Sequence, residues 1–222
     1  IADDLLQASE PGTDPVLGQI INKTMTKALR ARVLLNMGDY TNALAEAESL
    51  INSGYFALAN SANALRDMWT NDQGSEFIYV PAGTPDERFE YGSSVNDNNF
   101  RSYSQAAGAY SPDWIPSKST VDMYSATDWR TDIFLDKQNV KCQDQKASNI
   151  ALFNKFLGNP SLSKKGDSKF ARYNLPKLFR IAETYLIAAE AAYRLNDAAK
   201  AQQYLNALRT KRGLLATVET GE

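Results

Sequence analysis

Aromatic side chains and planar hydrogen-bonding groups gather in one window in the middle of the sequence. The amides of Asn98 and Asn99 and the guanidinium of Arg101 supply hydrogen-bonding groups held in a plane. Aromatic rings add flat apolar faces. The aromatic members are Phe100, Tyr103, Tyr110 and Trp114. These seven residues, which we call the aromatic window, are our candidate ligand-binding residues. The alternative is that the rings hold a long loop against the rest of the protein.

The composition excludes several kinds of catalytic and metal chemistry. The sequence has no histidine, which removes Ser-His-Asp and Cys-His catalysis and imidazole metal ligands. Cys142 is the single cysteine, so neither an internal disulfide nor a cysteine-based zinc site can form. The run from Asn96 to Asn99 carries oxygen ligands but lacks the spacing of an EF-hand loop, and a solvated turn is predicted there. We therefore expect no cofactor, no metal site and no catalytic residues.

Two glutamates are the remaining candidates for acid–base chemistry. Glu183 and Glu190 lie seven residues apart, which places them on one face of a predicted helix. A glycosidase needs two carboxylates that flank a cleft, whereas these are expected to pair with Arg180 or Arg194. The sequence therefore favours a protein that is not an enzyme, and leaves a carboxylate-based hydrolase as one alternative.

The charge balance and the hydropathy pattern exclude further classes. The 222 residues include 24 Lys and Arg against 26 Asp and Glu, so no basic surface is expected to bind nucleic acid. No run approaches the roughly 18 consecutive apolar residues of a transmembrane helix. The first residues lack the basic and apolar regions of a signal peptide, and the sequence does not begin with Met, as expected of a partial chain.

Two pairs of predicted helices frame the aromatic window. The first pair spans residues 15–53, where Asp14 caps a helix that runs to Met37. Gly38 ends that helix and Asp39 caps the next one. A connection this short makes the two helices fold back antiparallel.

The second pair spans residues 175–213 and turns at Asn196-Asp197. It aligns without gaps with the first pair at an offset of 158 residues, so that Asp197 matches Asp39. Small residues and a Gly/Asn-Asp turn are typical of tetratricopeptide repeats, although two unrelated hairpins remain the alternative. Its first helix is expected to bury a stripe of period 3.6. That stripe comprises Leu178, Ala182, Tyr185, Leu186, Ala189, Ala192 and Tyr193.

The segment between the pairs, residues 76–170, is predicted to be an irregular ligand-binding insertion. Between Ala82 and Pro116 the helical period disappears, and ordered loops of this length are usually functional. Short helices are expected over residues 60–70 and 117–124, and short strands over residues 76–80, 133–135 and 151–156.

Several of these segments resemble the SusD/RagB-like family. The most specific resemblance lies in two segments near the end of the sequence, which we call the late signature. Residues 179–191 resemble the family's Arg-x-Ala-Glu-x-Tyr-Leu-Ile-x-Ala-Glu-Ala helix, and residues 205–214 resemble its Asn-x-Leu-Arg-x-Arg-Gly helix end. Supporting matches are residues 28–44, the strand Glu76-Phe-Ile-Tyr and the segment from Ile115 to Arg130. Order and spacing agree over nearly the whole chain.

The resemblance implies a mainly α fold. Its scaffold would be a tetratricopeptide-like α-α superhelix that carries a loop-rich insertion and a few short strands, as a single SusD-like domain over residues 1–222. It also implies a non-catalytic lipoprotein on the surface of the outer membrane. Such a protein binds glycans or other nutrient oligomers and works with a SusC-type TonB-dependent transporter. The lipidated cysteine of the family is not in this sequence, so the anchor is expected outside it.

The aromatic window has the chemistry that a glycan binder needs. Rings can cover the C–H face of a sugar, while amides and guanidinium groups bind paired hydroxyls. The alternative function is a tetratricopeptide-type module that binds a protein or peptide without binding carbohydrate. The long aromatic insertion favours glycan binding, because a plain repeat array needs no such insertion.

Overall fold

The computed structural model describes residue 19 and residues 21–86, 103–104, 107–156, 158–164 and 173–218, with the backbone alone at 103–104. Contacts divide the chain into two compact units, and each is considered by itself. The helical unit holds the described residues up to Ser61, Gly74–Ala82, and those from Pro176 onward. The mixed unit holds Ala62–Gln73 and the described residues from Gly83 to Leu175. That the whole chain forms one domain stays a prediction.

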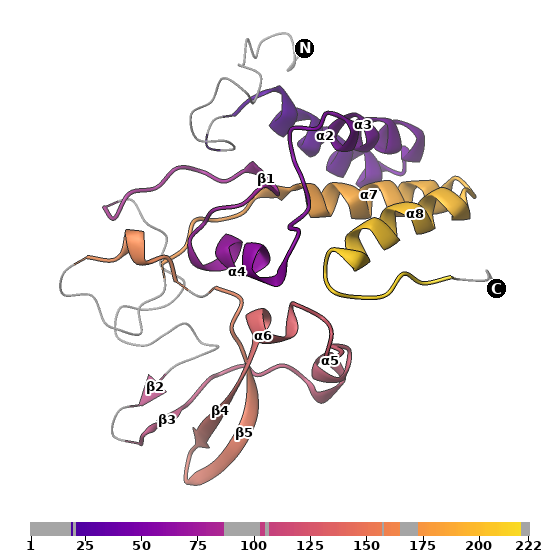
Figure 1. Ribbon diagram of the computed structural model, residues 1–222. Helices are drawn as coiled ribbons and strands as arrows, with labels where there is room; N and C mark the ends of the chain where they lie inside the picture. Colours follow the sequence, from indigo (N-terminus) through magenta and orange to yellow (C-terminus); the bar gives the residue numbers. More distant parts are fainter. Residues whose placement is uncertain are drawn as a thin grey trace. The chain divides into compact units, whose positions relative to one another are not determined.

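The described part of the helical unit contains two helical hairpins. The first is α2 (Lys23–Met37) followed by α3 (Tyr40–Asn52), and the second is α7 (Ile181–Arg194) followed by α8 (Ala198–Thr210). Figure 1 shows the two members of each hairpin side by side, and α7 of the second hairpin also packs against α3 of the first. This confirms the predicted tetratricopeptide-like scaffold.

Both hairpins turn at the predicted residues. Gly38 ends α2 with a φ of 79°, and Asn196 follows α7 with a φ of 62°, so both lie in the left-handed region. Asp39 then accepts a hydrogen bond from the amide of Asn42 at 3.2 Å. Asp197 accepts the equivalent bond from the amide of Lys200 at 3.0 Å. The two turns therefore use the same local chemistry 158 residues apart.

Both hairpins begin later than predicted. The first helix starts at Lys23 rather than at residue 15, because Asn22 caps it by accepting a 3.0 Å hydrogen bond from the amide of Met25. Asp14 lies outside the described residues. The second hairpin begins at Ile181 rather than at residue 175, since the two residues before it form strand β6 (Phe179–Arg180).

The core between the hairpins is built from small side chains. Ala31 of α2, Ala43 and Ala47 of α3, and Ala188 and Ala191 of α7 are fully buried in one cluster. Alanine at each contact lets the three helix backbones approach closely, which is the geometry that a repeat of small residues predicts.

The predicted stripe of α7 is wrong in part. Leu178, Leu186 and Tyr193 are exposed, whereas Ile187, Ala188 and Ala191 are buried. The cause is a tertiary contact. Helix α3 packs against the face of α7 that carries Ile187, whereas Leu186 and Tyr193 lie on another face of α7.

A small antiparallel pair joins distant parts of the helical unit. Strand β1 (Phe77–Tyr79) pairs with β6, with Phe77 opposite Arg180. Ile78 of β1 is fully buried in a second apolar cluster together with Leu50 of α3 and Ile181 of α7. The predicted strand over residues 76–80 is therefore confirmed within one residue at each end.

The mixed unit contains more regular structure than the predicted insertion. Its sheet has the order β2-β3-β4-β5, and the long strands β4 (Leu135–Cys142) and β5 (Gln145–Phe153) form an antiparallel hairpin. The short strands β2 (Tyr103–Ser104) and β3 (Ala109–Tyr110) extend it. Its described residues include the helices α4 (Ala62–Thr70), α5 (Lys118–Asp122) and α6 (Thr131–Phe134) and the 3-10 turn η2 (Pro160–Leu162).

The strands predicted over residues 133–135 and 151–156 are therefore wrong in extent. Ile133 belongs to α6, and the strands run through polar residues up to a turn at Gln143-Asp144. Most side chains of β5 are exposed, so the apolar alternation that would announce a strand is missing from the sequence.

A polar network ties three loops of the mixed unit together. The carboxylate of Asp72 accepts hydrogen bonds from Asn159 Nδ2 at 2.8 Å, Asn174 Nδ2 at 3.0 Å and the amide of Leu175 at 3.1 Å. Asn174 is fully buried and also donates to the carbonyl of Trp69 at 3.1 Å. Asp72, which follows α4, thereby connects the end of that helix to the loop at Asn159 and to the segment at Asn174 and Leu175.

Within the described ranges, no helix combines the length and the apolar character needed to cross a membrane. The same ranges hold no group of three or more Cys, Asp or Glu side chains arranged to bind a metal ion.

Candidate functional site

The aromatic window lies only partly within the described residues. Asn98, Asn99, Phe100 and Arg101 lie outside them, and the side chain of Tyr103 is not described either. Tyr110 and Trp114 are described. Because the other five side chains are not, the predicted binding role of the seven residues stays a prediction.

The sheet brings the two tyrosines of the window together along the backbone. The register of β2 and β3 places Tyr103 opposite Tyr110. Tyr110 is in turn paired with Val140 of β4 in parallel orientation. After β3, Ser111 Oγ donates a 2.8 Å hydrogen bond to the carbonyl of Lys141. The chain that leads to Trp114 is thus attached to the long hairpin.

Trp114 is exposed to solvent. Its exposed fraction is 64%, and its neighbour Ile115 is also exposed. Tyr110 is half-buried. Exposed apolar side chains mark a binding surface when they form a contiguous patch, and Trp114 and Ile115 are adjacent in sequence.

A cleft of about 570 Å³ lies beside the base of the long hairpin. Its walls come from α5 and the turn after it, α6, β4 and β5, which Figure 1 shows at one end of that hairpin. We call it the hairpin cleft. Its lining residues are Val121, Tyr124, Thr131, Asp132, Leu135, Asp136, Lys137 and Ala151.

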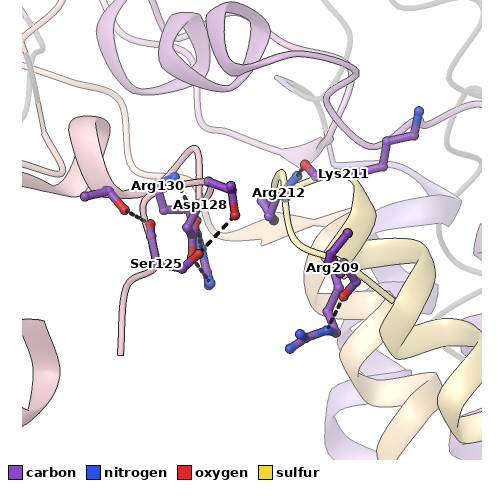
Figure 2. Close-up of polar contacts among 9 residues, drawn as sticks. Ser125, Asp128, Arg130, Arg209, Lys211 and Arg212 are labelled. Atoms are coloured by element: carbon purple, nitrogen blue, oxygen red, sulfur yellow. Dashed lines mark hydrogen bonds and ion pairs between the residues drawn. The ribbon is translucent and has the colours of Figure 1, made fainter. Parts of the chain in front are cut away.

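The segment between α5 and α6 is held by an internal ion pair. Arg130 Nη2 lies 2.7 Å from Asp128 Oδ2, and Arg130 Nε lies 2.9 Å from Oδ1. Figure 2 shows the two side chains turned toward each other next to Ser125, whose carbonyl accepts a 3.0 Å hydrogen bond from Thr131. The hydrogen bonds to Asp128 raise the pKa of Arg130, and this effect exceeds the lowering by burial.

This ion pair also places an aromatic ring of the hairpin cleft. The Arg130 guanidinium carbon lies 5.5 Å from the centroid of the Tyr124 ring, in cation–π geometry. Because both charges of the pair satisfy each other, Arg130 supports the ring without adding net charge to the cleft. The sequence analysis missed Tyr124, Asp132 and Asp136 as a group, since only the fold brings them together.

Three segments that carry the family resemblance meet at one buried carboxylate in the helical unit. Glu76 is fully buried, and its Oε1 accepts hydrogen bonds from the amide of Ala59 at 2.8 Å and from Arg212 Nη2 at 2.7 Å. Arg180 Nη1 lies 3.3 Å from Glu76 Oε2. Burial lowers the pKa of Arg180, while the charge of Glu76 opposes that shift. The late signature and the Glu76 strand therefore stabilise the scaffold.

The two glutamates considered for acid–base chemistry are ion-paired. Glu183 pairs with Arg32 of α2, through Nε at 2.6 Å and Nη2 at 2.7 Å, and not with Arg180 as expected. The guanidinium of Arg32 also lies 4.0 Å from the centroid of the Phe179 ring. Glu190 pairs with Arg194 at 3.6 Å, as expected. These contacts give both carboxylates structural roles.

These features together define a tetratricopeptide-like helical unit and a sheet-containing unit in which Trp114 is exposed. A family model described as the SusD family matches residues 61–220. The chain therefore belongs to the SusD family.

Solved structures support the fold. The surface glycan-binding protein A of Bacteroides uniformis is similar with 21% identity and a TM-score of 0.66, over 98% of this chain and 48% of that chain. The protein of the same name from Bacteroides thetaiotaomicron has 20% identity and a TM-score of 0.65, over 93% and 50%. A SusD superfamily protein from Bacteroides vulgatus has 22% identity and a TM-score of 0.65, over 96% and 44%. The chain thus spans about half the length of these structures. No curated protein matches it.

Proposed function

We propose that this chain is part of a non-catalytic protein that binds glycans at the cell surface. Membership of the SusD family supports this proposal, and two proteins of similar fold are named as surface glycan-binding proteins. The observation in this chain that carries it is the exposure of Trp114, on a segment attached to the sheet at Ser111. Tryptophan provides the largest flat apolar face available for a sugar ring.

In this proposal the aromatic window is the ligand-binding surface. Phe100, Tyr103, Tyr110 and Trp114 would cover the C–H faces of sugar rings, and Asn98, Asn99 and Arg101 would bind hydroxyls. No cofactor, metal or catalytic group takes part. The bound glycan would leave unchanged, as delivery to a transporter requires.

Affinity gel electrophoresis with polysaccharides in the gel tests this function. We expect the wild type to be retarded by at least one polysaccharide, and the same sugars to show no new reducing ends after incubation. Trp114→Ala should weaken the apparent affinity about fivefold or more, since stacking of an aromatic ring contributes on the order of 1 kcal/mol or more. Its matched control is Met123→Ala, another exposed apolar side chain of the mixed unit. Turnover of the sugars, or no retardation by any of them, would contradict the proposal.

We further propose a SusC-type TonB-dependent outer-membrane transporter as partner, and a lipid anchor outside this sequence. Both follow from the family rather than from a contact in this chain. Capture of such a transporter from solubilised outer membranes by the immobilised protein tests the first. A transporter that passes through without retention would argue against it.

The alternative function, a protein-binding module, is favoured by one feature of the helical unit. An apolar groove of about 720 Å³ runs between α7 and α8, and its lining includes Leu186, Ala201 and Leu205. By the offset of 158 residues, Ala201 and Leu205 correspond to Ala43 and Ala47, which lie buried where α7 packs against α3. The groove therefore suits a helix with small apolar residues. Retention of a helical peptide with the sequence of residues 181–194, together with no glycan binding, would favour this alternative.

A further inference from the structure

We propose that the apolar groove between α7 and α8 docks a further helix of the same polypeptide, from sequence outside residues 1–222, and that this helix carries a basic side chain opposite Glu190. We call this groove the outer groove. The inference does not depend on glycan binding. It names an occupant within the protein itself for the groove that the alternative function would use.

The outer groove repeats a surface that is already filled once in this chain. At the offset of 158 residues, most of its lining residues correspond to residues of α2 and α3 in the apolar cluster against α7. The lining residues Ala189, Tyr193, Ala198, Ala201, Gln202 and Leu205 correspond to Ala31, Leu35, Tyr40, Ala43, Leu44 and Ala47. Helix α7 fills the first surface with Ile187, Ala188 and Ala191. Because the two hairpins share one pattern, a helix of the same kind suits the second surface.

Helix α8 lacks the burial that its counterpart α3 has. Helix α3 buries four side chains, among them Ala43 and Ala47, whereas α8 is described in full and buries none. Leu186 and Tyr193, which line the outer groove from α7, are also exposed. The terminal repeat of a stacked array normally turns a polar face to water. The apolar face of this hairpin therefore indicates that stacking continues beyond α8.

Stacking within one polypeptide favours an occupant from the same protein. Helix α7, which packs against the first hairpin, belongs to the same chain as α2 and α3. A helix in the same polypeptide does not lose the translational and rotational freedom that a separate partner loses on binding. The two surface glycan-binding proteins of similar fold are about twice as long as this chain, which covers 48% and 50% of them. Chains of this fold therefore have the length to supply a further helix.

The rim of the outer groove specifies the charge of that helix. Glu190 lines the groove and corresponds to Arg32, which binds Glu183 of α7 through Nε at 2.6 Å and Nη2 at 2.7 Å. The sign at this position is reversed between the two hairpins, so the incoming helix should carry Lys or Arg where α7 carries Glu183. Glu190 also lies 3.6 Å from Arg194, but both side chains are about half exposed, and such pairs contribute little. A closer basic partner can therefore replace that contact.

Peptide binding to the chain of 222 residues tests the shape and the charge of the site. The probes are stapled, labelled helical peptides with the sequence of residues 181–194, one unchanged and one with Glu183→Lys, followed by fluorescence anisotropy. The Glu183→Lys peptide should bind about threefold more tightly, as expected of a partly exposed ion pair. Glu190→Lys in the protein should reverse the order of the two peptides.

Matched variants show where the peptides bind. Leu186→Glu in the protein should weaken both peptides about tenfold, because it places a charge in the apolar groove. Val33→Glu is the control, since Val33 of α2 is 46% exposed, close to the 48% of Leu186, and does not line the groove. Melting temperatures show whether each variant stays folded. Failure of both peptides to bind, equal binding by Leu186→Glu and the wild type, or an order that Glu190→Lys leaves unchanged would each overturn the inference.

The source of the helix is tested with a longer form of the protein that includes its natural flanking sequence. This form should not bind the peptides, because its own helix fills the outer groove. Binding as strong as that of the 222 residues would point to a helix of a partner protein and overturn the inference. A dimer of the 222 residues that Leu186→Glu dissociates would point to a second copy and also overturn it. None of these outcomes bears on glycan binding, which the polysaccharide gels decide separately.

Discussion

Arg212 Nη2 lies 2.7 Å from one carboxylate oxygen of Glu76 and 2.9 Å from the other. The exposed fraction is 0% for Glu76 and 5% for Arg212, so this ion pair is removed from water. The pair joins β1 to the end of α8, across 136 positions of the sequence. This pair stabilises the helical unit, because Arg212 without Glu76 would be a buried charge without compensation.

Glu76→Gln should therefore strongly destabilise the protein. The substitution keeps the shape of the side chain but leaves Arg212 with a buried positive charge, and the expected loss in free energy of unfolding is about 3–5 kcal/mol. Urea denaturation followed by circular dichroism measures it. The control is Asp122→Asn, which removes an exposed pair with Lys118 and should cost under about 1 kcal/mol. Equal effects of the two substitutions would show that the buried pair does not stabilise the unit.

Gly38→Ala and Gly38→Asn should differ in cost. Gly38 has a φ of 79°, and a Cβ there would meet only the Tyr40 hydroxyl at 4.0 Å, so the penalty is one of backbone conformation. Alanine should cost about 1 kcal/mol. Asparagine should cost less, since Asn196 adopts a φ of 62° at the equivalent turn of the second hairpin. Thermal denaturation of both variants checks the order, and an asparagine variant less stable than the alanine variant would contradict it.

Tyr204 should make stability depend on alkaline pH. Burial, followed by the 2.7 Å hydrogen bond to Glu48, raises the pKa of Tyr204 above its usual value. Because the folded pKa is raised, this contribution is complete below the unfolded pKa of about 10 and is lost as the pH rises toward the folded pKa. Urea denaturation at several pH values should show a shallower alkaline loss for Tyr204→Phe than for the wild type. Parallel curves would indicate that Tyr204 titrates normally.

Asp72→Ala should loosen the mixed unit at one defined place. It removes the acceptor of Asn159, Asn174 and the amide of Leu175, and a buried donor left without its acceptor costs about 1–3 kcal/mol. Hydrogen–deuterium exchange should show faster exchange of the Leu175 amide. Asp67→Ala is the control, since Asp67 accepts only an exposed hydrogen bond from Asn71 among the contacts described for its side chain. Unchanged protection of Leu175 would rule out a role for the network.

Tyr103→Ala should weaken glycan binding with little change in melting temperature. Tyr103 faces Tyr110 in the register of the outermost strand pair, so the backbone of β2 contributes only to the edge of the sheet. Affinity gels and thermal denaturation of the same preparation test both halves of this expectation. A variant that mainly unfolds would show that Tyr103 supports the fold instead.

The local features of the helical hairpins could be predicted from sequence. Gly38-Asp39 and Asn196-Asp197 form turns through their own backbone and side-chain preferences, so no distant contact is needed to place them. The strand at Glu76 and the late signature can also be predicted from sequence, because each is a short pattern of residues at fixed spacing. The first residue of α2 cannot be predicted in this way. Asn22 and the earlier Asp14 are both good capping residues, and the local sequence does not choose between them.

The sequence by itself determined the two pairs of helices and where they turn. That the middle of the chain binds a ligand through its aromatic residues stays a prediction. Only the tertiary structure decided that Ile187 rather than Leu186 faces the core, and that Glu76, Arg180 and Arg212 share one buried site. It also brought Tyr124 and Asp136 to one cleft. The physical reason is that capping and helix periodicity act within a few residues, whereas burial and the Glu76 ion pairs depend on partners that only the folded chain brings together.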